Sequence, residues 1–261
     1  MTETGIVTIA DRCYRNCDIK CKRPFCSNYT QHMKTINVID LGTQQYEDTY
    51  YLQKKIAGDI KRERGDDHIL LVEHPNIFTI GRSGTRNNLL VDEDFLNKNG
   101  LEVIEVDRGG DITFHGRGQL VAYLIFNLTK HIKDIRLFIK NLERVCELTI
   151  SEYGLAVDSE KTYTGLWVNG NKIGFIGIGI SNWITYHGVS INANVDLKYF
   201  SMIKPCGIDN LRVSSLQKIL NREIDIDLLK NIFVEKCCEV FGFERSCRDY
   251  AEATLVKKEA S

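Results

Sequence analysis

Cys206 is the cysteine whose setting in the sequence best suits chemistry. It stands between Pro205 and Gly207, and a fixed turn beyond a strand can present a sulfur to a cleft as a nucleophile. The chain holds only 3 prolines, which makes the one beside Cys206 informative. Cys146 and Cys237, by contrast, fall on the apolar stripes of predicted helices. A small buried thiol is the alternative interpretation of Cys206.

A glycine-rich block from Arg108 to Leu120 is the second chemical feature. Four glycines and His115 lie between two predicted strands, and glycine lets a backbone turn sharply and approach a ligand closely. An ordinary glycine-rich turn, with His115 hydrogen-bonded locally, is the alternative. We interpret the whole block as a binding loop.

Two later stretches repeat this mixture of glycine and lone polar residues. The apolar segment Lys172–Gly179 contains three glycines, which weaken a strand unless a ligand or another backbone must come close. His187–Asn192 follows it and begins His-Gly. Lys172, considered alone, is best interpreted as a solvated lysine at the end of a hairpin.

Three common catalytic motifs are absent. The sequence has no G-x-x-x-x-G-K-[ST], no G-x-G-x-x-G and no H-E-x-x-H. It therefore predicts neither a standard nucleotide-binding loop nor an obvious catalytic zinc. We expect no metal and no cofactor.

Strands and helices alternate in the first half of the chain, and hairpin strands follow. Hydrophobic periodicity predicts helices over residues 46–64, 92–99, 134–154 and 226–241. Strands are predicted over residues 35–41, 68–73, 76–81, 101–106, 120–127, 165–168, 173–180 and 184–192, with a hairpin turn at Asn169-Gly170. The mixture predicts an α/β or α+β fold with a mixed sheet, as one catalytic domain over residues 34–245.

Composition sets limits on partners and location. The chain has 261 residues and a net charge of −1, which gives no support to nucleic-acid binding. Its apolar stretches are far shorter than the ~20 residues that span a bilayer. The first residues lack the basic and apolar regions of a signal peptide. We expect a soluble, cytoplasmic protein with neither a nucleic-acid nor a membrane partner.

The two ends of the chain differ from the rest. Residues 1–33 form a cysteine-rich extension that contains Cys13, Cys17, Cys21 and Cys26. The odd total of 9 cysteines argues against a complete disulfide framework, and the spacing is not a standard zinc pattern. We expect the extension to be irregular and dispensable, so that a chain beginning at Met33 folds and stays active. Residues 246–261 form a charged tail.

Taken in order, these blocks resemble the octanoyltransferases of lipoate biosynthesis, the lipoyl(octanoyl) transferases. The resemblance runs from Lys34 to Leu220. It is carried by DLGTQQYEDTYYLQ, EHPNIFTIGRSGTRNNLL, DRGGDITFHGRGQLVAY, TGLWV followed by NKIGFIGIGIS, HGVSINANVDLKYFSMIKPCGI, and VSSL. Several independent motifs in this order and spacing make the resemblance specific.

The resemblance implies an acyltransferase of the biotin/lipoate protein ligase fold. Its octanoyl donor would be octanoyl-acyl carrier protein, and its acceptors would be lysines on lipoyl domains of 2-oxo-acid dehydrogenase complexes and on the glycine cleavage H protein. The family's acyl-thioester cysteine falls on Cys206 and its paired lysine on Lys172. The stretches that hold the acyl substrate fall on Arg108, Gly109, Gly110, Asp111, Ile112, Thr113, Phe114, His115, Phe175, Ile176, Gly177, Gly188, Val189 and Ser190.

This chemistry also fits the residues by themselves. A thioester donor already carries the energy needed to form an amide, so no ATP loop is required. A neighbouring ammonium favours the thiolate form of a cysteine, and Lys172, once neutral, can take the proton of the incoming amine. Backbone N–H groups near Cys206 or His115 are candidate oxyanion donors.

The chain departs from the family pattern at three points. Arg117 stands where the family usually has proline, and we expect it to place a charge beside the pocket. Phe114 replaces a tyrosine and loses its hydroxyl, and Ser214 replaces a threonine. Because the family's partners are acidic and this chain is nearly neutral, we also expect a local basic rim, for which Arg82 and Arg86 are the candidates.

Three other functions are considered. The first is an ATP-dependent lipoate or biotin ligase of the same fold, because Gly116-Arg117-Gly118 is similar to a ligase loop. Such a ligase needs no cysteine paired with the lysine. A requirement for ATP would identify it. The second is a carrier-protein or iron-sulfur binding module built on residues 13–26, which metal analysis would detect. The third is a cysteine hydrolase that pairs Cys206 with His115 or His187, although no orienting acid stands out.

Overall fold

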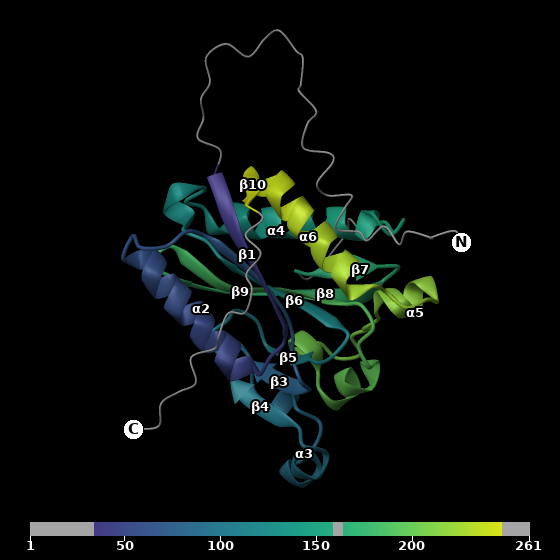
Figure 1. Cartoon of the computed structure of the whole chain (residues 1–261). Helices are drawn as coiled ribbons and strands as arrows, with labels where there is room; N and C mark the ends of the chain where they lie inside the picture. Colours follow the sequence, from purple (N-terminus) through teal and green to yellow (C-terminus); the bar gives the residue numbers. More distant parts are fainter. Residues whose placement is uncertain (1–33, 159–163, 247–261) are drawn as a thin grey trace, which may run out of the picture. The chain divides into compact units, whose positions relative to one another are not determined.

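The structure is a computed structural model that describes residues 34–158 and 164–246 (Figure 1). The cysteine-rich extension and nearly all of the charged tail lie outside these described residues, and so do the predictions made for them. Among the described residues, no helix combines the length and the apolar character needed to cross a bilayer.

The larger of two sheets has seven strands in the order β10-β1-β2-β6-β9-β8-β7. β1 pairs in parallel with β10 and β2, and the other neighbours are antiparallel. The sheet is therefore mixed, as predicted. The strands are β1 (Lys34–Thr43), β2 (His68–Glu73), β6 (Gln119–Ile125), β7 (Leu166–Val168), β8 (Asn171–Ser181), β9 (Ile184–Asn192) and β10 (Phe243–Ser246).

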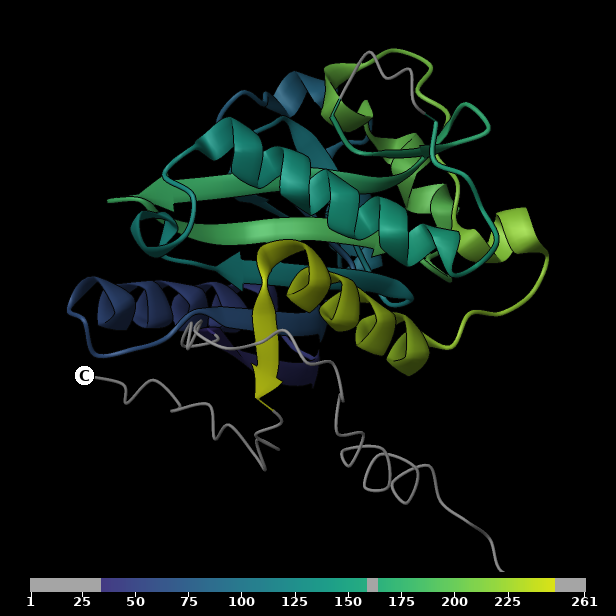
Figure 2. The same ribbon diagram turned by 90° about the horizontal axis from the view of Figure 1, so that it is seen from above.

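Helices cover both faces of this sheet (Figures 1 and 2). Leu120 and its alternate neighbours on β6 pack with α4 (Ile135–Ser151) and α6 (Ile226–Phe241) in one core. Val121 and its alternate neighbours pack with α2 (Tyr46–Lys61) in another. Because successive side chains of a strand point to opposite faces, a strand between two helical layers must be apolar on both sides. This explains why β6 is a continuous apolar run.

A second, smaller sheet has three strands in the order β4-β3-β5. Its strands are β3 (Ile77–Ile80), β4 (Glu102–Glu105) and β5 (Ile112–His115). Its core packs Phe78 and Phe114 against Phe175 and Phe200 of neighbouring segments. The remaining short elements are η1 (Arg86–Asn88), α3 (Glu93–Asn99), η2 (Leu128–Lys130), η3 (Leu197–Met202), η4 (Pro205–Gly207) and α5 (Leu216–Leu220).

Capping residues fix the start of α4 and the end of α3 next to the predicted bounds. The Asp134 carboxylate accepts hydrogen bonds from the backbone N–H groups of Arg136 and Leu137, at 2.8 and 3.1 Å, and starts α4. Gly100, with φ 60°, ends α3 in the left-handed conformation that glycine adopts without strain. The prediction missed the strands β5 and β10, the helix α5 and the short turns η1, η2, η3 and η4. β5 lies inside the glycine-rich block, where the glycines concealed a strand of four residues.

Candidate active site

The turn at Cys206 holds the thiol in an unusual backbone conformation. Cys206 has φ 60° and ψ 17°, the left-handed region that side chains other than glycine rarely adopt. The turn is closed by hydrogen bonds from the Gly207 N–H to the Lys204 carbonyl, at 2.9 Å, and from the Ile208 N–H to the Pro205 carbonyl, at 3.2 Å. Such strain is found where a site needs a fixed geometry. The thiol is half-buried.

Lys172 lies against this thiol. Its Nζ donates to Cys206 Sγ at 3.6 Å and to the Thr164 carbonyl at 2.8 Å. Lys172 is only 1% exposed, so the interpretation of Lys172 as a solvated lysine is wrong. Its own backbone is fixed because its N–H donates to the Arg212 carbonyl and its carbonyl accepts from the Ser214 N–H. The fold thus joins two residues 34 positions apart.

Both side chains face a pocket with about 530 Å³ of empty space, part of it open to solvent. The predicted binding residues that line it come from the loop before β5, from β5 itself, and from β8 and β9. They are Arg108, Gly110, Asp111, Ile112, Thr113, His115, Phe175, Ile176, Gly177, Gly188 and Val189.

Three predicted binding residues do not line the pocket. Phe114 points into the core of the small sheet, where its ring lies 4.6 Å from that of Tyr199, because neighbours on a strand face opposite ways. Gly109 donates its N–H to the Ile178 carbonyl instead. Ser190 is buried, and its hydroxyl has no hydrogen-bond partner.

Two residues of the glycine-rich block that differ from the family pattern, Arg117 and Phe114, do not line the pocket. Arg117 is exposed in the turn between β5 and β6 and is not part of the pocket lining. The charge of Arg117 therefore does not form part of the pocket wall. The missing hydroxyl at Phe114 would also lie outside the pocket, in the small-sheet core.

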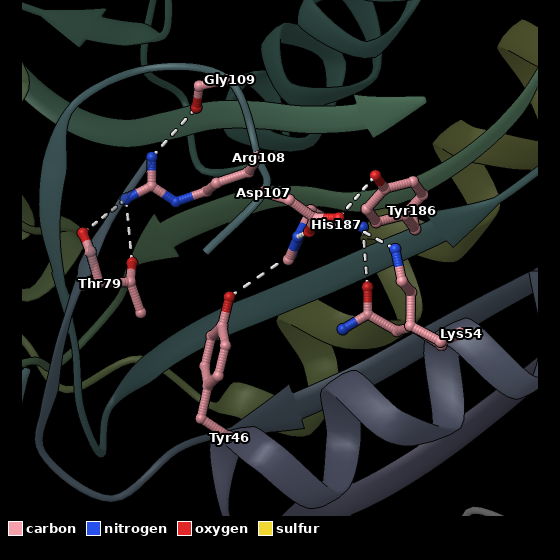
Figure 3. A network of polar contacts seen from close by, with 9 residues as sticks. Tyr46, Lys54, Thr79, Asp107, Arg108, Gly109, Tyr186 and His187 are labelled. Carbon is pink, nitrogen blue, oxygen red and sulfur yellow. Dashed lines mark hydrogen bonds and ion pairs between the residues drawn. The ribbon is translucent and has the colours of Figure 1, made fainter. Parts of the chain in front are cut away.

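Arg108 is a buried cation at the pocket wall. Its Nη2 donates to the Thr79 carbonyl and hydroxyl at 2.8 and 2.9 Å, and its Nη1 donates to the Gly109 carbonyl at 3.1 Å (Figure 3). Burial lowers the pKa of Arg108. A Cβ atom at Gly177 would lie 3.2 Å from Arg108 Cδ and 2.9 Å from the Gly109 carbonyl oxygen. Glycine is therefore needed where β8 passes under this loop.

Sequence reasoning missed several pocket residues, namely Tyr46, Val121, Tyr123 and Thr164, and it considered His187 only as a base for hydrolysis. Tyr46 belongs to α2 and Tyr123 to β6, and each has the pattern of an ordinary core residue. The sequence holds no local signal that would separate these side chains from the rest of the core. Only the packing of α2 against the sheet brings them to the pocket.

A hydrogen-bond network surrounds His187 (Figure 3). Its Nε2 lies 3.0 Å from Asp107, whose carboxylate also accepts from Lys54 Nζ at 2.9 Å and from the Tyr186 hydroxyl at 2.8 Å. Burial opposes the charge of Asp107, but these hydrogen bonds hold its pKa well below the usual range. The carboxylate places the imidazole proton on Nε2, so that Nδ1 accepts from the Tyr46 hydroxyl, 3.5 Å away.

Two more histidines, His74 and His115, lie near His187 and the pocket. Burial lowers the pKa of His74 and of His187 to about 4, and that of His115 to about 3. All three are therefore neutral at pH 7. His74 donates from Nδ1 to the Gln44 carbonyl and accepts from the Tyr123 hydroxyl at Nε2, both at 2.8 Å.

We expect these histidines to make the fold sensitive to mild acid. Between pH 6.5 and 4 they are protonated in the unfolded chain but neutral in the folded one, so the free energy of unfolding falls as the pH falls. A pKa of about 4 in place of 6.5 corresponds to about 3 kcal/mol for each histidine. Urea denaturation at pH 7.5, 6 and 5 should show a loss of several kcal/mol. Equal stability at all three values would contradict the neutral assignment.

The lipoyl protein ligase A/B catalytic-domain family model matches residues 45–238. The chain is also similar to an octanoyltransferase from Thermoanaerobacter sp. (strain X514). The two are 42% identical over 224 residues, which cover 85% of this chain and 95% of the relative. The matched family region contains Tyr46, Lys172 and Cys206.

Solved structures of low sequence identity share the fold. A bi-partite lipoate protein ligase from Thermoplasma acidophilum, described with its E2 lipoyl domain, has a TM-score of 0.66 at 15% identity and covers 82% of this chain and 86% of that one. Lipoate-protein ligase A bound with ATP has a TM-score of 0.62 at 16% identity and covers 82% and 88%. The fold is thus that of the lipoate protein ligases, as expected from the sequence motifs.

Proposed function

The chain belongs to the octanoyltransferases of the lipoyl protein ligase A/B catalytic-domain family, and from that premise we propose that it transfers octanoyl through a thioester on Cys206. The donor would be octanoyl-acyl carrier protein, and the acceptor a lysine of a lipoyl domain. The observation that supports this proposal most is the 3.6 Å contact between Lys172 Nζ and Cys206 Sγ in the pocket. A ligase that activates a free acid has no use for this contact.

In the first step the Cys206 thiolate attacks the thioester carbonyl carbon of the donor. The bond between that carbon and the carrier sulfur breaks, and the leaving thiolate takes a proton from the Lys172 ammonium. The products are the S-octanoyl enzyme, the free carrier thiol and a neutral Lys172. The ammonium stabilises the thiolate before the attack, and afterwards it is already placed as a general acid.

In the second step a neutral lysine amine of the acceptor attacks the acyl-cysteine carbonyl. Neutral Lys172 removes the proton of that amine, the amide forms, and Cys206 leaves as a thiolate. The starting ion pair is thereby restored, and the cycle uses neither ATP nor metal in its balance. The Thr164 carbonyl, which accepts from Lys172 Nζ at 2.8 Å, would hold the Lys172 nitrogen beside the sulfur, whether that nitrogen is charged or neutral.

The octanoyl chain would lie along β8 and β9, where Phe175, Gly177 and Val189 line the pocket. Arg108 and the loop that follows it would close over the chain from the small sheet. The acceptors we propose are the lipoyl domains of 2-oxo-acid dehydrogenase complexes and the glycine cleavage H protein.

A cytoplasmic location also stays a prediction.

The competing function is an ATP-dependent ligase, and one assay separates the two. Purified protein would be given a lipoyl-domain acceptor with either octanoyl-acyl carrier protein alone or free octanoate plus Mg-ATP. We expect amide formation on the acceptor only with the thioester donor. Transfer that requires ATP and the free acid would overturn the proposal.

The basic rim expected for the carrier protein is reduced to Arg82. Arg86 lies 3.0 Å from Glu93 and 3.7 Å from Glu105, which neutralise its charge. Arg82 is exposed, and its backbone N–H donates to the carbonyl of Arg108 at 2.9 Å, beside the pocket. It is therefore well placed to attract an acidic partner.

Arg82→Glu should lower kcat/KM for octanoyl-acyl carrier protein by about threefold to tenfold at low salt, because a rim charge acts on association. The difference should shrink in high salt, where the charge is screened. Arg144→Glu is the matched control, since Arg144 is an exposed arginine of α4, the helix layer on the opposite face from α2. Equal values for Arg82→Glu and the unmodified protein at low salt would contradict the assignment.

A further inference from the structure

One group of pocket-lining residues lies at a single level of the large sheet, away from the thiol. Tyr123 on β6 pairs with Gly188 on β9, and Gly188 pairs with Gly177 on β8. These three residues therefore stand at one level of the sheet. Tyr46 and His187 line the pocket together with Tyr123.

The thiol stands nearer the other end of β8. Lys172 precedes Gly177 by five positions, which is about 16 Å of strand. Its Nζ reaches toward Phe175, 5.1 Å from the ring centroid, while it contacts Cys206 Sγ. The sulfur therefore lies between the levels of Lys172 and Phe175, about 7–16 Å from the level of Gly177. An extended octanoyl chain, with C–C bonds of about 1.5 Å in a zigzag, reaches about 9 Å.

Tyr46, Tyr123 and His187 are polar but uncharged, and the buried cation Arg108 lines the same pocket. Burial raises the pKa of Tyr46 and of Tyr123, so both phenols keep their protons. The hydroxyl of Tyr123 lies 2.8 Å from His74 Nε2, and that of Tyr46 lies 3.5 Å from His187 Nδ1. With these polar atoms directed to one another, carbon atoms of the rings are left to meet a hydrocarbon tail.

The rings of Tyr46 and His187 are also packed against neighbouring aromatic rings. Tyr46 lies 5.1 Å from His74 between centroids, and His187 stacks on Tyr50 at 5.5 Å. Asp107 completes the support, because its hydrogen bond to His187 Nε2 fixes the tautomer that accepts from Tyr46 (Figure 3). Packed aromatic rings yield little to an extra methylene group.

We propose that Tyr46, Tyr123 and His187 form an end wall that sets the longest acyl chain the pocket accepts, with Asp107 as a positioning residue behind it. This inference rests on the proposed acyl transfer through Cys206. A longer chain must displace a supported ring or leave its last carbons outside the pocket. One methylene in an apolar pocket changes kcat/KM by about 10- to 200-fold, so two additional carbons should be rejected strongly.

The test compares kcat/KM for octanoyl- and decanoyl-acyl carrier protein. The unmodified protein should favour octanoyl by at least about tenfold. Tyr46→Ala should raise the decanoyl-to-octanoyl ratio by at least about tenfold, whereas Tyr46→Phe, which keeps the ring, should leave the ratio near that of the unmodified protein. An unchanged ratio in folded Tyr46→Ala, or an unmodified protein that uses both donors equally, would overturn the end wall. Failure of the unmodified protein to transfer octanoyl at all would instead overturn the proposed function.

A reciprocal variant keeps the proposal testable if Tyr46→Ala does not fold. Val121 lines the pocket and pairs with Ser190, which pairs with Phe175, so Val121 lies between the thiol and the wall. Val121→Ile adds one methyl group there and should raise the hexanoyl-to-octanoyl ratio by about tenfold. No rise would count against the wall.

Asp107 is tested by the same ratio. Asp107→Ala should raise use of decanoyl, because His187 loses the partner that fixes its tautomer. Asp107→Asn can still accept from Nε2 and should restore the octanoyl preference. A merely structural role would lower both rates together and leave the ratio unchanged, and that result would remove Asp107 from the proposal.

Discussion

Cys206→Ser is expected to lower octanoyl transfer by at least about 10³-fold, because a serine hydroxyl at neutral pH lacks the nucleophilicity of a thiolate. The substitution changes one atom, and serine can occupy the same turn between Pro205 and Gly207. The fold should therefore be retained, with a circular dichroism spectrum and a melting temperature close to those of the unmodified protein. Transfer is measured as amide formed on a lipoyl domain from octanoyl-acyl carrier protein.

Cys238→Ser is the matched control for that result. Cys238 is a half-buried cysteine of α6, which lies on the face of the large sheet opposite α2. Its replacement should change the transfer rate by less than about threefold, as expected for a substitution remote from the reacting atoms. If Cys206→Ser kept the turnover of the unmodified protein, the thioester mechanism would be wrong.

Lys172→Met should lower transfer by about 10²- to 10⁴-fold, the usual contribution of a positioned general acid and base. Methionine fills a similar buried volume, so the lost charge rather than a cavity should cause the effect. Single-turnover measurements should show that both half-reactions are slowed, since the ammonium serves acylation and the neutral amine serves transfer to the acceptor. Normal acylation with slow transfer would assign Lys172 to the second step alone.

The double variant separates a working pair from two independent residues. If Cys206 and Lys172 act as a unit, the combined loss should be close to that of Cys206→Ser alone. Losses that multiply would show that Lys172 contributes by a route that does not pass through the sulfur.

Helices and long strands were predictable because their signals are local. Asp134 caps α4 through its own carboxylate, and an amphipathic stripe continues from there. The four-residue strand β5 was missed because the glycines around it outweighed its short apolar pattern. The short helix α5 and the strand β10 carry equally weak local signals.

The site was predictable only in part. Motif resemblance predicted Cys206 and Lys172 as a pair, and the structure brings their side chains into contact. A lysine after a hairpin turn is normally solvated, but tertiary packing surrounds the Lys172 side chain with Thr164, Trp167 and Phe175. Tyr46 and Tyr123 approach the pocket from α2 and β6, 77 positions apart in the printed sequence. Their joint position depends on how the helix crosses the sheet, which no local pattern encodes.

The acyl-enzyme itself can be observed directly. Protein would be mixed with octanoyl-acyl carrier protein without acceptor, quenched in acid, and analysed by intact mass and by peptide mapping. The account predicts the addition of one octanoyl mass, located on the peptide that contains Cys206 and lost when a lipoyl domain is added before the quench. Normal transfer with no octanoyl on Cys206 at any time point would contradict it.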